Sequence, residues 1–182
     1  MPAEHLTPGF FGKIPATGDF VARRLPRDFV RMWDRLAARH LVRLLELELW
    51  PTDRGLRFLL NIAGRGTVAG VAVPSSDRVG RRFPLTASAP CPGAGPDTIA
   101  DASEWFGQVE ETLATVRDDG GNADRLAETL AGLPFPRLPR STDGTHGKAL
   151  WLWTRNTPPV EADPEAPQGA LDRLFAPVSE AG

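Results

Sequence analysis

The sequence predicts a single-domain α/β protein in which helices pack against a central mixed, largely antiparallel sheet. β-rich runs follow one another in the middle of the chain without helices between them, which implies antiparallel pairing. Two long segments carry apolar residues at helical spacing, so they form amphipathic helices that must cover the sheet. The length of 182 residues is typical of one domain.

The first elements are a strand and a long helix. Residues 9–15 form a short apolar strand between two prolines, and Gly18 in the following turn is free to take positive φ. A helix starts at Pro26, whose fixed φ suits a first turn, and should end near Trp50 because the residue before a proline disfavours helix. Its predicted apolar stripe is Phe29, Trp33, Leu36, His40, Leu44 and Leu47.

Three strands are expected next. Residues 56–62 and 67–73 are joined by a short glycine-rich turn, which indicates a hairpin. A polar loop at 75–82 leads into a third strand at 83–89.

The second half returns to helical spacing over 98–118, with a shorter helix over 122–130. After an irregular, proline-containing stretch, residues 148–154 form a last strand. We expect residues 1–155 to make the α/β domain, and 156–182 to add a proline-rich acidic linker (156–167) and a short docking helix (168–175) of the same domain.

Charge and composition exclude several classes of protein. Lys plus Arg total 21 against 23 Asp plus Glu, a net charge of −2, which argues against a nucleic-acid binder and against an anchor on anionic membranes. No apolar stretch approaches the roughly 20 residues that cross a bilayer, and the first residues lack the pattern of a secretory signal. Cys91 is the single cysteine, so no internal disulfide can form. We expect a cytoplasmic protein.

No residue pattern predicts a catalytic centre. The histidines at His5, His40 and His146 have no metal-ligand spacing, and His40 is interpreted as a core or rim residue of the helix. The glycines at 64–70 precede a strand rather than a helix, so they do not form a phosphate-binding loop. We therefore expect no cofactor, no metal and no enzymatic activity.

Two segments are unusually specific. The first runs Gly-Phe-Phe-Gly-Lys-Ile-Pro-Ala-Thr-Gly-Asp-Phe-Val over 9–21 and continues to Asp34, and the second runs Val-Pro-Ser-Ser-Asp-Arg-Val-Gly-Arg-Arg-Phe-Pro-Leu over 73–85. Both combine turn residues, aromatics and opposite charges. Asp77 can accept from the amides that follow it, and the arginines after it offer forked donors near Asp19 or Asp34 if the segments meet. The candidate residues for partner binding, or for a purely structural clamp, are Lys13, Asp19, Arg23, Arg24, Trp33, Asp34, Asp77, Arg78, Arg81 and Arg82.

These segments closely resemble the TagF family, the N-terminal TagF domain associated with bacterial type VI secretion systems. The late Leu150-Trp151-Leu152-Trp153 strand and the closing segment 171–175 are similar too, so the resemblance covers essentially the whole chain in order. It implies a three-layer α/β/α fold and a cytosolic regulator that represses secretion after translation. The implied partner is the forkhead-associated scaffold protein of the apparatus.

Two other functions stay open. One is a structural accessory subunit of the secretion apparatus, which a small domain of near-neutral charge is compatible with. The other is a hydrolase that uses the carboxylates of Asp19, Asp34 and Asp77, which requires these acids to converge in a pocket.

Overall fold

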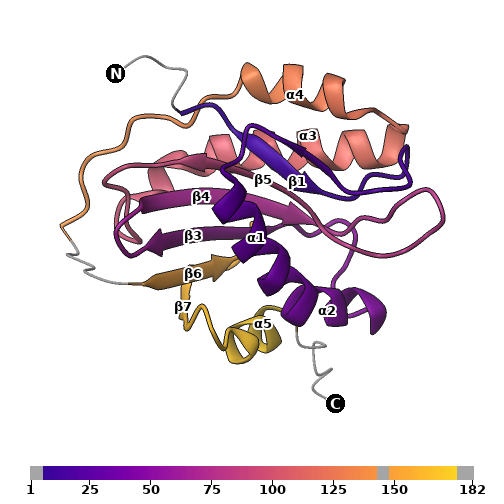
Figure 1. Cartoon of the computed structure of the whole chain (residues 1–182). Helices are drawn as coiled ribbons and strands as arrows, with labels where there is room; N and C mark the ends of the chain where they lie inside the picture. Colours follow the sequence, from indigo (N-terminus) through magenta and orange to yellow (C-terminus); the bar gives the residue numbers. More distant parts are fainter. Residues whose placement is uncertain (1–5, 143–147, 176–182) are drawn as a thin grey trace.

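The computed structural model describes residues 6–142 and 148–175, so His5, His146 and residues 176–182 lie outside the described residues. Its centre is one seven-stranded sheet with the order β2-β1-β5-β4-β3-β6-β7, in which every pairing is antiparallel (Figure 1). The strands are β1 (Gly9–Gly12), β2 (Val21–Arg23), β3 (Leu56–Ile62), β4 (Gly66–Val73), β5 (Leu85–Pro90), β6 (Ala149–Trp153) and β7 (Val160–Ala162).

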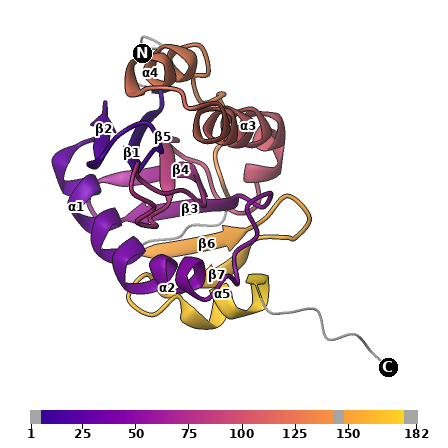
Figure 2. The same ribbon diagram turned by 90° about the vertical axis from the view of Figure 1, so that its right-hand side faces the viewer.

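Helices cover both faces of this sheet, which confirms the three-layer α/β/α arrangement (Figure 2). One layer holds α1 (Arg27–Leu36), the π-helical turn η2 (Ala37–Leu41), α2 (Val42–Glu46) and α5 (Gln168–Phe175). The other holds the 3-10 turn η3 (Ile99–Ala102), α3 (Ser103–Asp119) and α4 (Ala123–Ala131). Within the described ranges, none of these helices has the length and apolar character needed to span a bilayer.

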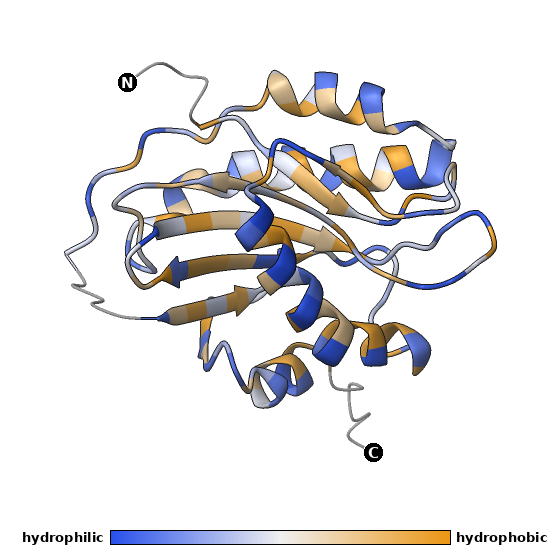
Figure 3. Cartoon of the chain, viewed as in Figure 1, coloured by the Kyte–Doolittle hydropathy of each residue, from blue (hydrophilic) through white to orange (hydrophobic). Residues whose placement is uncertain are grey.

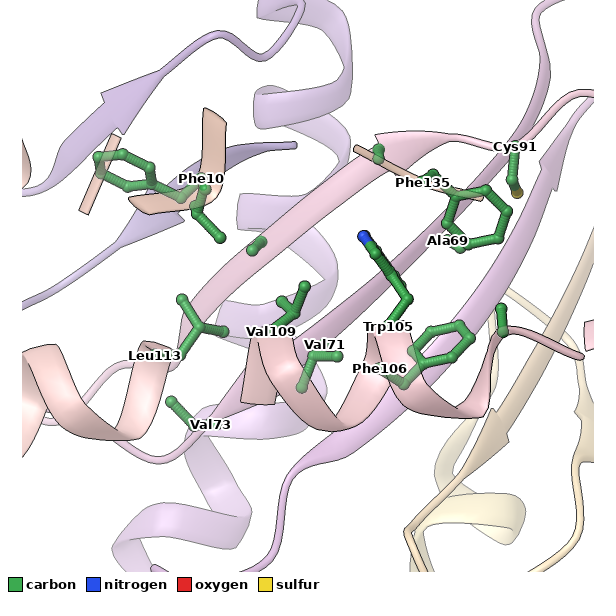
Figure 4. Packing of buried hydrophobic residues seen from close by; sticks show 14 of the residues in the cluster. Phe10, Ala69, Val71, Val73, Cys91, Trp105, Phe106, Val109, Leu113 and Phe135 are labelled. Atoms are coloured by element: carbon green, nitrogen blue, oxygen red, sulfur yellow. The ribbon is translucent and has the colours of Figure 1, made fainter. Parts of the chain in front are cut away.

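Alternation along the strands divides the apolar residues between two cores. On the α3 side, Trp105, Phe106 and Val109 belong to one buried cluster with Val71 and Val73 of β4 (Figure 4). On the α1 side, Trp33 stacks on Phe58 of β3 with ring centroids 4.3 Å apart. Figure 3 shows the resulting pattern, in which helices are hydrophobic toward the sheet and hydrophilic away from it.

Two edge strands were not predicted. The segment interpreted as a linker contains β7, which pairs with Leu150–Leu152 of β6 and extends the sheet. Pro158 and Pro159 lie just before β7, where a strand at the edge of a sheet tolerates missing donors. β2 is only three residues long, too short to show an alternating pattern.

The long helix is interrupted and ends earlier than predicted. The chain leaves α2 after Glu46, and Glu48 adopts a left-handed conformation with φ 55°, which terminates the helix well before Pro51. Leu47 is consequently 54% exposed, although it was assigned to the apolar stripe. The π-helical turn also brings Ala37 and Leu41 into the core in place of Leu36 and His40, which are only half-buried.

Glycines 9 and 12 explain the first motif. A Cβ on Gly9 would lie 2.4 Å from the carbonyl oxygen of Arg23 in β2. Gly12 has φ +144°, and a Cβ there would lie 2.1 Å from the carbonyl oxygen of Pro84. Both neighbouring strands therefore approach β1 more closely than any side chain permits. Gly18, by contrast, is not among the glycines with positive φ, so that expectation was wrong.

Candidate functional site

The two specific segments meet at one end of the sheet. Gly12, the last residue of β1, pairs with Leu85, the first residue of β5, and Leu85 also pairs with Val73, the last residue of β4. The loops that follow β1 (residues 13–20) and β4 (residues 74–84) must therefore leave the sheet side by side, as Figure 1 shows. We call them the motif loops.

The carboxylate of Asp77 joins the motif loops. Its side chain is fully buried. Asp77 Oδ2 lies 3.1 Å from Lys13 Nζ and 2.7 Å from Arg81 Nε. Oδ1 accepts from the backbone amides of Val79 at 3.1 Å and Arg81 at 2.9 Å, which confirms the prediction that Asp77 binds the amides after it. Lys13, Asp77 and Arg81 form what we call the Asp77 cluster.

This environment determines the charge of Asp77. Burial by itself raises the pKa of the carboxyl, but the Arg81 amide, the Lys13 ammonium, the Arg81 guanidinium and the Val79 amide outweigh it and lower the pKa to about 2. Asp77 is therefore ionised at neutral pH, and its charge is matched by hydrogen bonds and cations rather than by water.

Acid should weaken the fold through Asp77. The folded-state pKa of about 2 lies below the ordinary value of 3.8, so the unfolded chain takes up the proton first as the pH falls. The contribution of Asp77 is complete above about pH 4 and is lost as the pH falls through the folded-state pKa. Urea unfolding from about pH 5 to about pH 2 should show a steeper decline for the wild type than for Asp77→Asn. Parallel declines would contradict this assignment.

Further hydrogen bonds connect the two motif loops. Arg78 donates its amide to Thr17 O at 2.8 Å and its guanidinium to Ala16 O at 2.8 Å. Arg81 donates to Gly18 O at 2.9 Å, and Ser75 Oγ donates to Lys13 O at 2.7 Å. The arginines were expected to bind near Asp19 or Asp34, but the donors of Arg78 and Arg81 go to Asp77 and to carbonyl groups of the facing loop. Turn carbonyls cannot be recognised as acceptors in a sequence, because they depend on how the loops pack.

Aromatic side chains support the same loops and leave an apolar rim. Phe20 stacks on Phe11 with ring centroids 5.5 Å apart and contacts Phe83 edge-on at 4.9 Å. Lys13 Nζ lies 5.0 Å from the Phe20 ring centroid, a cation–π contact. Phe20 is nevertheless 49% exposed, and Val79 at the tip of the second loop is 72% exposed. Neither Phe20 nor Val79 was among the predicted site residues. Each is an apolar residue within a charged motif, and that pattern could have indicated an exposed contact residue.

Seven of the ten predicted residues lie outside the Asp77 cluster. Two of them, Arg78 and the exposed Asp19, belong to the motif loops described above, and the other five contact other parts of the fold or lie on α1. Arg23 pairs with Asp124 at 3.5 Å and Arg24 donates to Ala127 O at 3.3 Å, so both attach the β2 edge to α4. Trp33 is buried and donates to Thr86 Oγ1 at 2.8 Å. The remaining two are Asp34, which is half-buried on α1, and Arg82.

Arg82 closes the end of a helix. Its guanidinium donates to Leu45 O at 2.5 Å and lies 3.3 Å from Glu48 Oε1. A cation on the last carbonyls of α2 is favourable because those groups have no partner within the helix. Arg82 thus connects the second motif loop to the α1 layer rather than to the first loop.

The acids of the hydrolase hypothesis have unlike surroundings. Asp77 is buried and paired, Asp19 is exposed on the first motif loop, and Asp34 is half-buried on α1. In the parts of the chain that the structure describes, no group of three or more His, Cys, Asp or Glu side chains is placed to hold a metal ion.

Comparisons with known proteins give the family of this chain. The family model described as the TagF N-terminal domain, type VI secretion system-associated, matches residues 9–133 and so includes both motif loops. The crystal structure of PA0076 from Pseudomonas aeruginosa PAO1 is similar, with 31% sequence identity, a TM-score of 0.66 and coverage of 81% of each chain. No curated protein matches the chain significantly. The chain therefore belongs to the TagF N-terminal domain family, which is associated with type VI secretion.

Proposed function

We propose that this protein is a cytosolic, post-translational repressor of a type VI secretion system, and that it acts by binding another protein rather than by catalysis. The partner we propose is the forkhead-associated scaffold protein of the apparatus. The family assignment supports the link to secretion. The ordered motif loops, with apolar side chains exposed on them, support binding of a protein.

The observation that carries the proposal is that two distant segments form one fixed surface with exposed apolar tips. The Asp77 cluster and the loop-to-loop hydrogen bonds hold the backbone, while Phe20 and Val79 remain 49% and 72% exposed. A surface that is ordered before binding loses little conformational entropy when a partner docks. Apolar and arginine side chains on such loops are the groups that concentrate binding energy.

The chemistry of Asp77 also favours binding over catalysis. A general base needs a free lone pair and a pKa near the working pH. Asp77 accepts from two amides and two cations, and its pKa is lowered to about 2, far from that range. Its role is to hold the loops.

Expression in excess should silence secretion without changing transcript levels. Val79→Glu should abolish silencing and binding to the purified scaffold protein, because it places a charge at the apolar tip without touching the Asp77 cluster. Ala100→Glu adds the same charge at an exposed position beyond the opposite end of β5 and should behave like the wild type. For the wild type and the two variants, secretion assays measure silencing, pull-downs measure binding, and melting temperatures check that each protein is folded.

Two outcomes would count against the proposal. Undiminished secretion in the presence of abundant, folded wild-type protein would contradict repression. Co-purification with sheath or baseplate at a fixed stoichiometry would instead favour a structural subunit.

A further inference from the structure

The helical arm formed by α1, η2 and α2 carries a row of arginines at every fourth position. We call the row the arginine ladder; its members are Arg27, Arg31, Arg35, Arg39 and Arg43, and all five are exposed. A second row at every fourth position, Phe29, Trp33, Ala37, Leu41 and Leu45, is buried, with exposed fractions of 6% or less. The two rows are offset by two residues, which places them on opposite sides of a helix.

A four-residue repeat does not fit a regular α-helix. Each step of four residues rotates about 40° beyond one full turn, so four steps would carry either row about 160° around the axis. The π-helical turn at Ala37–Leu41 has a wider turn, in which four residues fall short of a full rotation, and it therefore reverses the drift. The π-turn thus keeps the apolar row on the sheet and the arginines on the outer side, where Figure 3 shows hydrophilic stretches recurring along the arm.

The ladder has no ion-pair partner in the part of the chain that the structure describes. Across residues 6–142 and 148–175, no ladder guanidinium takes part in a salt bridge or a side-chain hydrogen bond. Of the acids that line the cavity beside it, Asp28 pairs with Arg65, and Glu165 pairs with Lys148. The pKa of Glu165 is lowered chiefly by its contact with Lys148, and the charge of Arg39 lowers it least.

A groove runs beside the ladder. It has a volume of 310 Å³ and lies between α1 and the segment after β7. Cations outnumber acids on its walls, because Arg31, Arg35, Arg39 and Lys148 line it beside the paired carboxylates of Asp28 and Glu165, and apolar side chains such as Met32 and Leu36 complete the lining. Cations around a partly apolar floor are complementary to a protein segment that combines carboxylates with aliphatic side chains.

We propose that the arginine ladder is a docking surface for an acidic segment of the partner protein, whose Asp and Glu carboxylates pair with Arg31, Arg35 and Arg39. The inference rests on the proposed function and assigns it a second contact, away from the motif loops. A protein partner fits better than nucleic acid. A nucleic acid carries its negative charge past the ladder, along a protein whose net charge of −2 repels it.

The test compares full-length wild type with the triple variant Arg31→Glu/Arg35→Glu/Arg39→Glu. The matched control is Arg125→Glu/Arg155→Glu/Arg173→Glu, which reverses three exposed arginines on α4, the β6–β7 turn and α5. Binding to the purified forkhead-associated scaffold protein is measured at low and at roughly physiological ionic strength, together with silencing of secretion in cells.

The ladder variant should bind at least about tenfold more weakly and fail to silence secretion, because like charges would then face each other. The control should stay close to the wild type, and added salt should weaken the wild type more than the ladder variant. If the glutamates impair folding, Arg31→Gln/Arg35→Gln/Arg39→Gln removes the charge without reversing it and should still weaken binding.

The outcomes separate the two proposals. A wild type that neither binds nor silences overturns the proposed function and this inference with it. A ladder variant that binds and silences like the wild type overturns the ladder alone. Ladder-dependent binding to duplex DNA or to anionic phospholipid vesicles that exceeds binding to the scaffold protein would also overturn it.

Discussion

Replacing Gly12 with alanine should destabilise the protein by more than about 4 kcal/mol. Losses of this size are exceptional and come from mechanisms such as backbone strain and overpacking, both of which apply here. Gly12 has φ +144°, which an L-residue rarely adopts, and the new Cβ would lie 2.1 Å from the carbonyl oxygen of Pro84. The clash is with backbone atoms of Pro84, just before β5, and of Leu85, the first residue of β5, so it cannot be relieved by a rotamer change. Urea unfolding of the purified variant, or its absence from the soluble fraction, is the measurement.

Gly18→Ala is the matched control for this prediction. Nothing lies within 4 Å of a Cβ at Gly18, and its φ is not positive. Alanine there should leave stability unchanged or raise it by about 0.4–1 kcal/mol, because it restricts the unfolded chain. If both variants lost similar stability, the close approach of β1 to β5 would not be the reason for the glycine.

Glu110→Ala should cost about 3–5 kcal/mol, the usual loss when one partner of a buried ion pair is removed. Glu110 on α3 lies 3.2 Å from Arg57 Nε on β3, and the two side chains are only 9% and 7% exposed. Glu110 also accepts from the amide of Gly55 at 3.1 Å. Removing the carboxylate leaves a buried guanidinium and a buried amide without an acceptor. Chemical denaturation gives the free energy of unfolding.

A paired replacement distinguishes the ion pair from simple loss of packing. Arg57→Met/Glu110→Leu removes both charges and keeps the volume, so it should lose only about 1–3 kcal/mol, the cost of the unsatisfied Gly55 amide. A double variant less stable than Glu110→Ala would contradict the view that the stranded Arg57 charge dominates.

Much of the fold was predictable because local signals were strong. The hairpin of β3 and β4 and the closing helix α5 were confirmed within a residue of their predicted bounds, since turn glycines and apolar spacing act over a few residues. β7 was missed because it has only three residues and lies in a segment rich in prolines and acids, a composition that indicates a linker. Glu110 was missed because a charged residue on an amphipathic helix resembles a surface residue until its partner on β3 is known.

The candidate site was predicted in part. Asp77, Arg78 and Arg81 were identified by their motif, and the backbone amides that Asp77 binds follow from local geometry. That Lys13 completes the cluster, while Arg82 caps α2, depends on which loops the sheet brings together. The arginine ladder was unrecognised because a four-residue repeat matches neither helical nor strand periodicity without the π-turn.

By itself the sequence determined the types of the longer elements and the family, because periodicity, turn residues and motif order are properties of neighbouring residues; the three-layer class followed from the family resemblance. Only the tertiary structure decided which charges are buried in pairs and which face solvent alone. Ion pairing depends on distances between segments such as residues 13 and 77, and those distances exist only once the strands have paired.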